Sequence, residues 1–284
     1  MHFDTDGIYT LQYTAEDSCG NETIEEREVE VYSLKTVLYT DGTFIINERS
    51  IDRDANIALH GAVTNEYRPL DESYRYTFAN RSDRPWNSQV ASIKRIEIGS
   101  NIAPENMRYW FYGCSNVREY DFSNLDTSSV LSMYSTFTLW NIDRLDLSSF
   151  DTHNVTDMSW MFANATISEI DMSSFDTNNL KKMNGMFRDT IIETIDISSF
   201  DFTSLTDFSE AFRNINLLTS QDILTTIIVK AGTDISSISG ASAFSDRRNL
   251  VGGNGTVYSS SYYDSQYARI DNPPDAPGYF TAKA

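Results

Sequence analysis

The chain has 284 residues, 40% of them hydrophobic and 13% aromatic, and its 22 Lys and Arg against 41 Asp and Glu give a net charge of −19. This composition is typical of a folded protein with a hydrophobic core, and so acidic a surface disfavours nucleic acid and anionic membranes as partners. No apolar run reaches the roughly 18 residues of a membrane-spanning helix. The two cysteines, Cys19 and Cys114, are too few for a disulfide framework or a four-cysteine zinc site.

Residues 1–34 alternate polar and apolar side chains on both sides of the sequence "DSCGN", which predicts a β-hairpin. The segment resembles the last two strands of the immunoglobulin-like modules of bacterial surface proteins. Because the earlier strands of such a module are missing, we expect the chain to be a fragment of a longer protein. Its first residues lack the basic and apolar regions of a secretory signal, so no signal or anchor is expected within it.

Residues 35–106 form a second region, in which "YTDGTFIINE" predicts a hairpin around Asp41 and Gly42. We expect this region to cover the N-terminal end of the repeats that follow it, as terminal units of a repeat protein must.

Residues 107–217 contain a repeat of 25 residues. An aspartate begins each copy of the motif, at Asp121, Asp146, Asp171 and Asp196. In "LDLSSFDTHNVTDMSWMF", residues 145–162, the first letters alternate as in a strand, and the later apolar residues are spaced as on one face of a helix. The helical runs follow residues that favour N-caps, namely Ser129, Asn154, Asn179 and Ser204.

Strand and helix in each copy predict an α/β solenoid with parallel strands, in which stacking of the copies creates the core. Where the leucine-rich repeat has an Asn or Cys, these copies have Phe150, Phe175 and Phe200, and we expect these rings to line up in a column.

Residues 218–284 predict a degenerate last copy and a C-terminal cap. Leu224, Ile227 and Val229 align with the earlier strands after an insertion, and Phe244 aligns with the end of the last helical run. The tyrosines of the tail are expected to close the end of the core.

The four aspartates that begin the copies should lie on one face, about 4.8 Å apart, where like charges repel. Hydrogen bonds from the serines two places later or from backbone N–H groups are the favoured compensation. A calcium ion held by Asp121, Asp146, Asp171 and Asp196, or a basic partner, is the alternative.

A binding face is expected on the same strands. The position two residues before each aspartate differs from copy to copy, as solenoid residues that determine specificity would, and Trp140 is a candidate contact for sugar or protein. Trp160, beside Met161, is expected to pack. The candidate face comprises Glu119, Asp121, Arg144, Asp146, Glu169, Asp171, Thr194, Asp196 and Trp140. Residues 119–217 hold 5 bases and 16 acids, a net charge of −11, which indicates a basic or cation-bridged ligand.

The repeat motif and its flanking segments resemble the BspA-like leucine-rich repeat surface proteins of bacteria, which also occur in mobile and viral genes. The resemblance implies a non-catalytic protein of the bacterial cell surface that binds host or neighbouring-cell proteins. The alternatives are a receptor-binding or structural component of a bacteriophage virion, and the targeting module of a glycan-processing enzyme. The partner is therefore expected to be a protein, with a glycan as the other choice, and the oligomeric state stays open.

No enzymatic motif accompanies these features. The three histidines are scattered, and the sequence has neither a nucleophile elbow nor a phosphate-binding loop. We therefore expect no enzymatic activity and no cofactor other than the calcium ion considered above.

Overall fold

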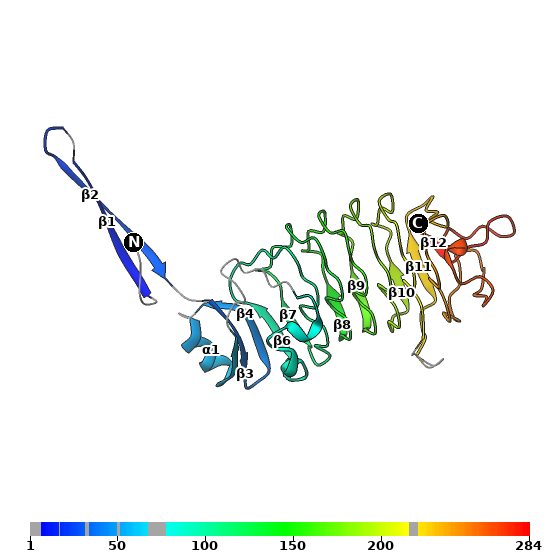
Figure 1. The fold of residues 1–284 in the computed structure, drawn as a ribbon, viewed down its shortest axis with the longest axis horizontal. Coiled ribbons are helices and arrows are strands. Elements are labelled where there is room, and N and C mark those ends of the chain that lie inside the picture. Colours follow the sequence, from blue (N-terminus) through cyan, green and yellow to red (C-terminus); the bar gives the residue numbers. More distant parts are fainter. Residues whose placement is uncertain (1–6, 17, 32–33, 50–51, 68–77, 216–220) are drawn as a thin grey trace.

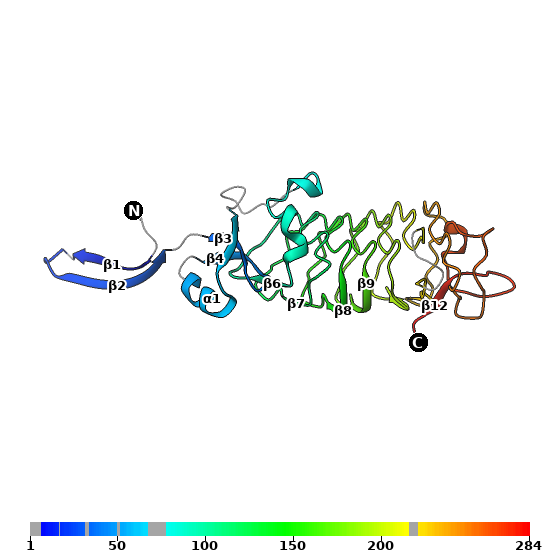
Figure 2. The same ribbon diagram turned by 90° about the horizontal axis from the view of Figure 1, so that it is seen from below.

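The computed structural model describes residues 7–16, 18–31, 34–49, 52–67, 78–215 and 221–284. The chain is elongated: a hairpin, a small block with one helix, a stack of similar coils and a C-terminal block follow one another along the long axis (Figure 1). Seen from below, the strands lie side by side along one side of the coils and irregular turns form the other (Figure 2). None of the helices in the described ranges is long and apolar enough to cross a membrane.

The N-terminal hairpin consists of β1 (Gly7–Glu16) and β2 (Glu22–Val31), which pair in antiparallel register from Gly7↔Val31 to Glu16↔Glu22. Figures 1 and 2 show it extending away from the rest of the chain. Nearly all of its described side chains are exposed, because the described residues place no second layer against it.

The N-terminal block is a five-stranded sheet of order β5-β3-β4-β6-β7 with the helix α1 (Arg53–His60) beside it. Its strands are β3 (Leu34–Tyr39), β4 (Thr43–Arg49), β5 (Val63–Tyr67), β6 (Arg95–Ile98) and β7 (Glu119–Asp121). The predicted hairpin is present: β3 pairs with β4 across Asp41 and Gly42, whose φ of 95° favours glycine. Two short 3₁₀ helices, η2 (Arg81–Asp83) and η3 (Asn87–Ser92), follow.

The repeats form stacked coils with parallel strands. The strands are β8 (Asn141–Asp146), β9 (Thr166–Asp171), β10 (Thr194–Asp196), β11 (Thr226–Val229) and β12 (Phe280–Ala282). Asp146 lies opposite Asp171, 25 residues later, so the period read from the sequence is the period of the stack. The predicted last copy is also found, because Ile227 of β11 pairs beside Ile195 of β10.

The predicted α/β solenoid of strand–helix units is wrong. The structure is β-rich, and in the described residues the only α-helix is α1, which lies outside the repeats. In the predicted helical runs alternate backbone N–H groups bond to the next coil: that of Trp160 to the carbonyl of Asn184 (2.8 Å) and that of Phe162 to the carbonyl of Met186 (2.9 Å). In an α-helix each of these N–H groups would instead bond to the backbone carbonyl four residues earlier in the same helix.

Two further observations explain why no helix forms there. Two positions in the copies have a left-handed backbone, which interrupts a helix. The first position comprises Tyr109 (φ 61°), Ser135 (55°), Trp160 (61°), Gly185 (57°) and Glu210 (59°), and the second comprises Gly113 (79°), Leu139 (67°), Asn164 (55°) and Asp189 (54°). Two of the expected N-cap residues bond to the preceding coil instead. The side-chain amides of Asn154 and Asn179 donate to the backbone carbonyls of Ser128 and His153, each at 2.8 Å.

Stacked phenylalanines run through the core, though from a different set than predicted. The continuous column contains Phe111, Phe137, Phe162, Phe187, Phe212 and Phe244, with successive ring centroids 5.6, 5.9, 5.5, 5.8 and 5.5 Å apart. Of the expected column, Phe175 stacks on Phe200 at 6.1 Å, whereas Phe150 contacts Phe122 and Phe137. All three predicted rings are nevertheless buried.

A buried arginine closes each end of the stack. Arg84 donates to the carbonyl of Tyr112 (2.8 Å) at the N-terminal end. Arg247 donates to the carbonyl of Phe187 (2.9 Å) and pairs with Asp222 (2.8 Å) at the other end. Both guanidinium groups donate to backbone carbonyls, and their burial lowers the pKa of both arginines.

The glycine-rich sequence "GGNG" is part of the C-terminal cap. It wraps around Asp271, whose buried carboxylate accepts the N–H groups of Asn254 (2.8 Å), Thr256 (3.0 Å) and Gly278 (3.2 Å). The short 3₁₀ helix η4 (Ser265–Tyr267) belongs to the same cap. The predicted boundary between residues 217 and 218 lies outside the described residues.

Candidate functional site

The variable positions of the predicted binding face pair across the strands. Arg144 on β8 and Glu169 on β9 lie opposite each other with their charged atoms 3.1 Å apart, and Arg95 on β6 contacts Glu119 on β7 in the same way. All four side chains are well exposed, so the pairs contribute little stability. Thr194, the uncharged member, faces Thr226 on β11. From Arg95 through Glu119 and Arg144 to Glu169, the charge at this position therefore changes sign from one strand to the next.

The aspartates that begin the copies are fixed by their own turns. Each carboxylate oxygen Oδ1 accepts the backbone N–H of the serine two residues later. The donor–acceptor distances are 2.9 Å for Asp121, and 3.0 Å for Asp146, Asp171 and Asp196. Asp196 additionally accepts from Lys283 at 2.9 Å.

These hydrogen bonds favour the charged carboxylates and lower their pKa values. Hydrogen bonds from the side chain and backbone of Ser148 lower the pKa of Asp146, and those from Ser173 lower the pKa of Asp171. The repulsion expected between stacked carboxylates is therefore offset within each coil.

A second row of aspartates repeats the same turn at the next corner of the coil. Its members accept the N–H two residues on, at 2.9 Å for Asp126, 3.1 Å for Asp151, 3.0 Å for Asp176 and 2.7 Å for Asp201. The threonine after each of the first three also links coils: Thr127, Thr152 and Thr177 donate to the carbonyls of Asp151, Asp176 and Asp201 in the next coil. Turn formation is thus a sufficient reason for this row.

The calcium site considered above fits the four strand aspartates poorly. Nowhere in the described ranges do three or more His, Cys, Asp or Glu side chains come close enough together to hold a metal ion. Calcium needs six to eight oxygen ligands, whereas Asp121, Asp146, Asp171 and Asp196 are spread along the stack, each with one oxygen already used by its turn.

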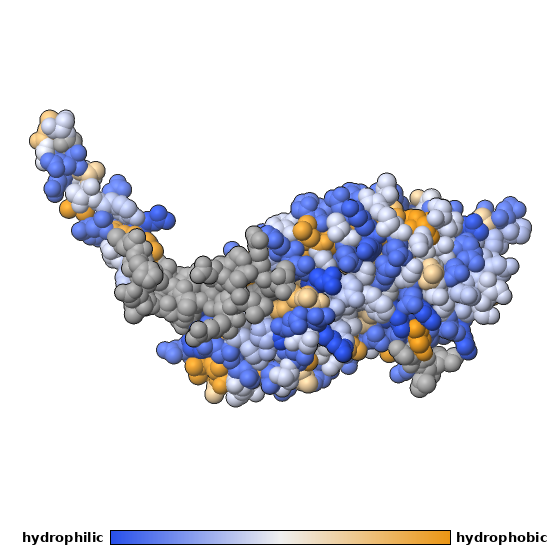
Figure 3. Space-filling model, viewed as in Figure 1, coloured by the Kyte–Doolittle hydropathy of each residue, from blue (hydrophilic) through white to orange (hydrophobic). Residues whose placement is uncertain are grey.

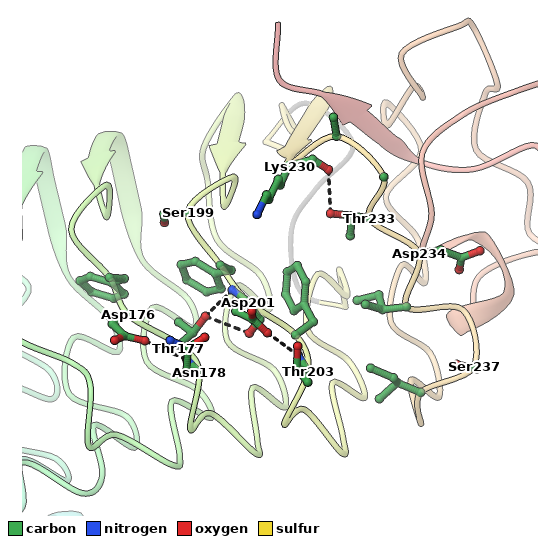
Figure 4. A pocket seen from close by; sticks show the side chains of 17 residues that line it. Asp176, Thr177, Asn178, Ser199, Asp201, Thr203, Lys230, Thr233, Asp234 and Ser237 are labelled. Carbon is green, nitrogen blue, oxygen red and sulfur yellow. Dashed lines mark hydrogen bonds between the residues drawn. The ribbon is translucent and has the colours of Figure 1, made fainter.

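A hollow of about 680 Å³ opens beside the second aspartate row. Asp176, Asp201 and Asp234 lie along it, and Lys230 extends its amino group over it (Figure 4). Backbone and side-chain hydrogen bonds from Thr203 lower the pKa of Asp201, and the charge of Lys230 adds to the effect. Phe202 and Ile238, both half-buried, line its apolar part.

The residues of this hollow were missed as a possible site by sequence reasoning. The signal was present, since Thr194 pairs with Thr226, 32 residues later, instead of 25 as in the earlier coils. The longer copy changes the turns next to Lys230 and so interrupts the regular surface.

Two tryptophans of the repeats, Trp140 and Trp160, differ in burial. Trp140 is 1% exposed, and its indole N–H donates to the carbonyl of Phe111 (2.8 Å), so it is a core residue and not a contact for sugar or protein. Trp160 is only half-buried and lies beside a second hollow.

One histidine has neighbours of the kind found in catalytic relays, but not their geometry. Nδ1 of His60 lies 3.0 Å from Asp41 and 3.2 Å from the hydroxyl of Thr43. A relay requires the carboxylate and the hydroxyl on different ring nitrogens, whereas here one nitrogen serves both.

Comparison with known families gives one match: residues 105–227 match the family described as "Mycoplasma protein of unknown function, DUF285". The match spans the coils from β7 to β10 and ends within β11. Comparisons with curated proteins and with solved structures found no match. The structure also corrects the expected leucine-rich-repeat solenoid, and the family description names no function, so it gives the expected adhesion and virion roles no support.

Proposed function

We propose that this chain is a non-catalytic module of a bacterial surface protein, and that the strand side of its coils binds a basic surface of another protein. The relation to BspA-like surface proteins is part of this proposal. The row of fixed carboxylates on the strand side is the observation that carries it.

The carboxylates of this row are both exposed and held in place. The side chains of Asp146 and Asp196 are 43% and 41% exposed, while Oδ1 of each accepts its own turn N–H. The second oxygen of Asp146 lies 3.6 Å from the guanidinium of Arg144, and that of Asp196 accepts from Lys283 at 2.9 Å. A partner therefore orders few side chains on binding, which lowers the entropic cost of association.

The remaining surface indicates polar recognition. On the face seen in Figure 3, hydrophilic residues predominate and apolar residues form small separate groups. Residues 119–217 carry a net charge of −11, and complementary charge increases the rate and specificity of association. A basic protein surface is the partner that this row would select.

The proposal is tested by reversing charge on the strand side. The variant Glu119→Lys/Glu169→Lys changes two exposed strand residues, and Glu25→Lys/Glu28→Lys makes the same change in net charge on the exposed hairpin. Surface proteins of host and neighbouring cells are captured on the immobilised chain, and the affinity of the captured protein is measured between about 50 and 500 mM NaCl.

We expect the captured protein to be basic, to bind more weakly as salt increases, and to be lost from the strand variant but not from the hairpin variant. Equal binding to both variants, or binding indifferent to salt, would remove the strand side as the site.

A further inference from the structure

A second hollow, of about 570 Å³, lies among the turns of the first coils and shares no residue with the strand row. Tyr109, Tyr134 and Trp160 form its walls, and we call it the aromatic groove. All three rings are half-buried. Tyr109 meets Tyr134 edge to face, with ring centroids 5.3 Å apart.

The repeat itself creates this groove. Trp160 stands at the first left-handed position of its copy, and the same position is Ser135 in the coil before it and Gly185 in the coil after it. A Cβ atom on Gly185 would lie 3.0 Å from the indole of Trp160, which is tighter than an ordinary contact, so glycine lets that ring rest closely on the next coil. The small side chain of Ser135 lines the groove together with Tyr109.

The walls are held in place before any ligand arrives. The guanidinium of Arg188 lies 4.8 Å from the ring centre of Trp160 and is itself paired with Glu210 at 2.6 Å. Arg108 lies 4.4 Å from the ring centre of Tyr134. Cations over aromatic faces fix the rings, and fixed rings reduce the ordering cost of binding.

The edge of the groove is polar. Arg81, which donates to the hydroxyl of Tyr112 at 2.5 Å, lines it together with the exposed side chain of Asn164. Aromatic walls with a few polar groups at the edge are characteristic of ligand sites. A pyranose ring has a matching structure, because its C–H face packs on an aromatic ring while its hydroxyl groups donate and accept hydrogen bonds.

We propose that the aromatic groove binds a saccharide through stacking on Trp160 and Tyr134 and hydrogen bonds to Arg81 and Asn164. A proline-rich peptide, the other common partner of aromatic grooves, offers only carbonyl acceptors. It would leave the amide N–H and C=O of Asn164 only partly used, so the polar edge favours the saccharide.

The test uses the labelled full chain on an array of neutral and acidic oligosaccharides, with three variants. Trp160→Ala removes a wall. Ser135→Tyr fills the groove, and the left-handed backbone tolerates it because Tyr109 occupies the same position in the preceding copy. Tyr263→Ala, at a tyrosine 37% exposed in the C-terminal block, is the matched control.

Binding in the groove is also measured through the quenching of Trp160 fluorescence. Trp86, Trp110 and Trp140 are at most 1% exposed, so acrylamide quenches mainly Trp160, and a saccharide in the groove should protect it. We expect Trp160→Ala and Ser135→Tyr each to weaken binding by about tenfold or more, and Tyr263→Ala to leave it unchanged. Absence of any bound oligosaccharide, binding that survives both groove variants, or protection of Trp160 by a decaproline peptide alone would overturn the proposal.

Discussion

At the scale of single residues, aromatic rings set the register of the coils. Phe187 is fully buried and stacks on Phe162 at 5.5 Å and on Phe212 at 5.8 Å. Stacking of this kind adds about 0.5–1.5 kcal/mol per pair to the burial of the ring. Because each ring contacts one ring on either side, losing one of them interrupts the column for both neighbours.

The variant Phe187→Ala should therefore lower the free energy of unfolding by about 3–5 kcal/mol, measured by urea denaturation. Phe187→Leu should cost less, because it leaves a smaller cavity. The control is Leu139→Ala, at a side chain 40% exposed, with an expected change within about 0.5 kcal/mol. Similar losses at both positions would show that the column does not stabilise the stack.

At the scale of elements, the coils are built from tandem turns, and apolar spacing does not separate such turns from a helix. Met158, Met161 and Phe162 are all buried, as a helical face predicts. Each turn also returns the chain after three residues, as when the N–H of Met161 bonds to the carbonyl of Met158. The sequence therefore predicted which side chains are buried and the repeat length, but not the element.

The same ambiguity explains why Trp140 was expected at the surface although it is buried. A tryptophan faces the core or the surface according to the backbone of its own turn, and the left-handed φ of 61° at Trp160 is not visible in a hydrophobic pattern. Gly185, in the middle of a supposed helix, was the available signal. The contact of each strand aspartate with the serine two residues later was predicted correctly, because an aspartate side chain commonly accepts the backbone N–H two residues on in a turn.

Two substitutions at Ser135 distinguish a turn from a helix, because the order of stability of the two variants is opposite in the two cases. With φ at 55°, Ser135→Gly should be more stable than Ser135→Ala by about 1 kcal/mol, since only the alanine carries the left-handed penalty. In a helix the alanine variant would be more stable by about 1 kcal/mol. Thermal melting of the pair decides between them, and a more stable alanine variant would restore the helix.

At the scale of the whole molecule, the aspartate turns couple the fold to pH. The pKa values of carboxylates in both rows and in the C-terminal cap are lowered. In the cap, burial alone would raise the pKa of Asp271, but hydrogen bonds from Thr256, Asn254 and Gly278 lower it. Since the unfolded chain has ordinary aspartate pKa values, it binds protons first as the pH falls.

The free energy of unfolding should therefore be undiminished above about pH 5 and decrease as the pH falls through the unfolded and then the folded pKa values, towards about pH 2. Urea midpoints across this range measure the decrease. Asp271→Asn should cost about 1.5–3 kcal/mol at neutral pH and make the acid decrease shallower, because its carboxylate no longer contributes. Asp143→Asn, at an exposed strand residue, should leave the slope unchanged. If stability instead increased towards acid, relief of repulsion within a chain of net charge −19 would outweigh the aspartate turns.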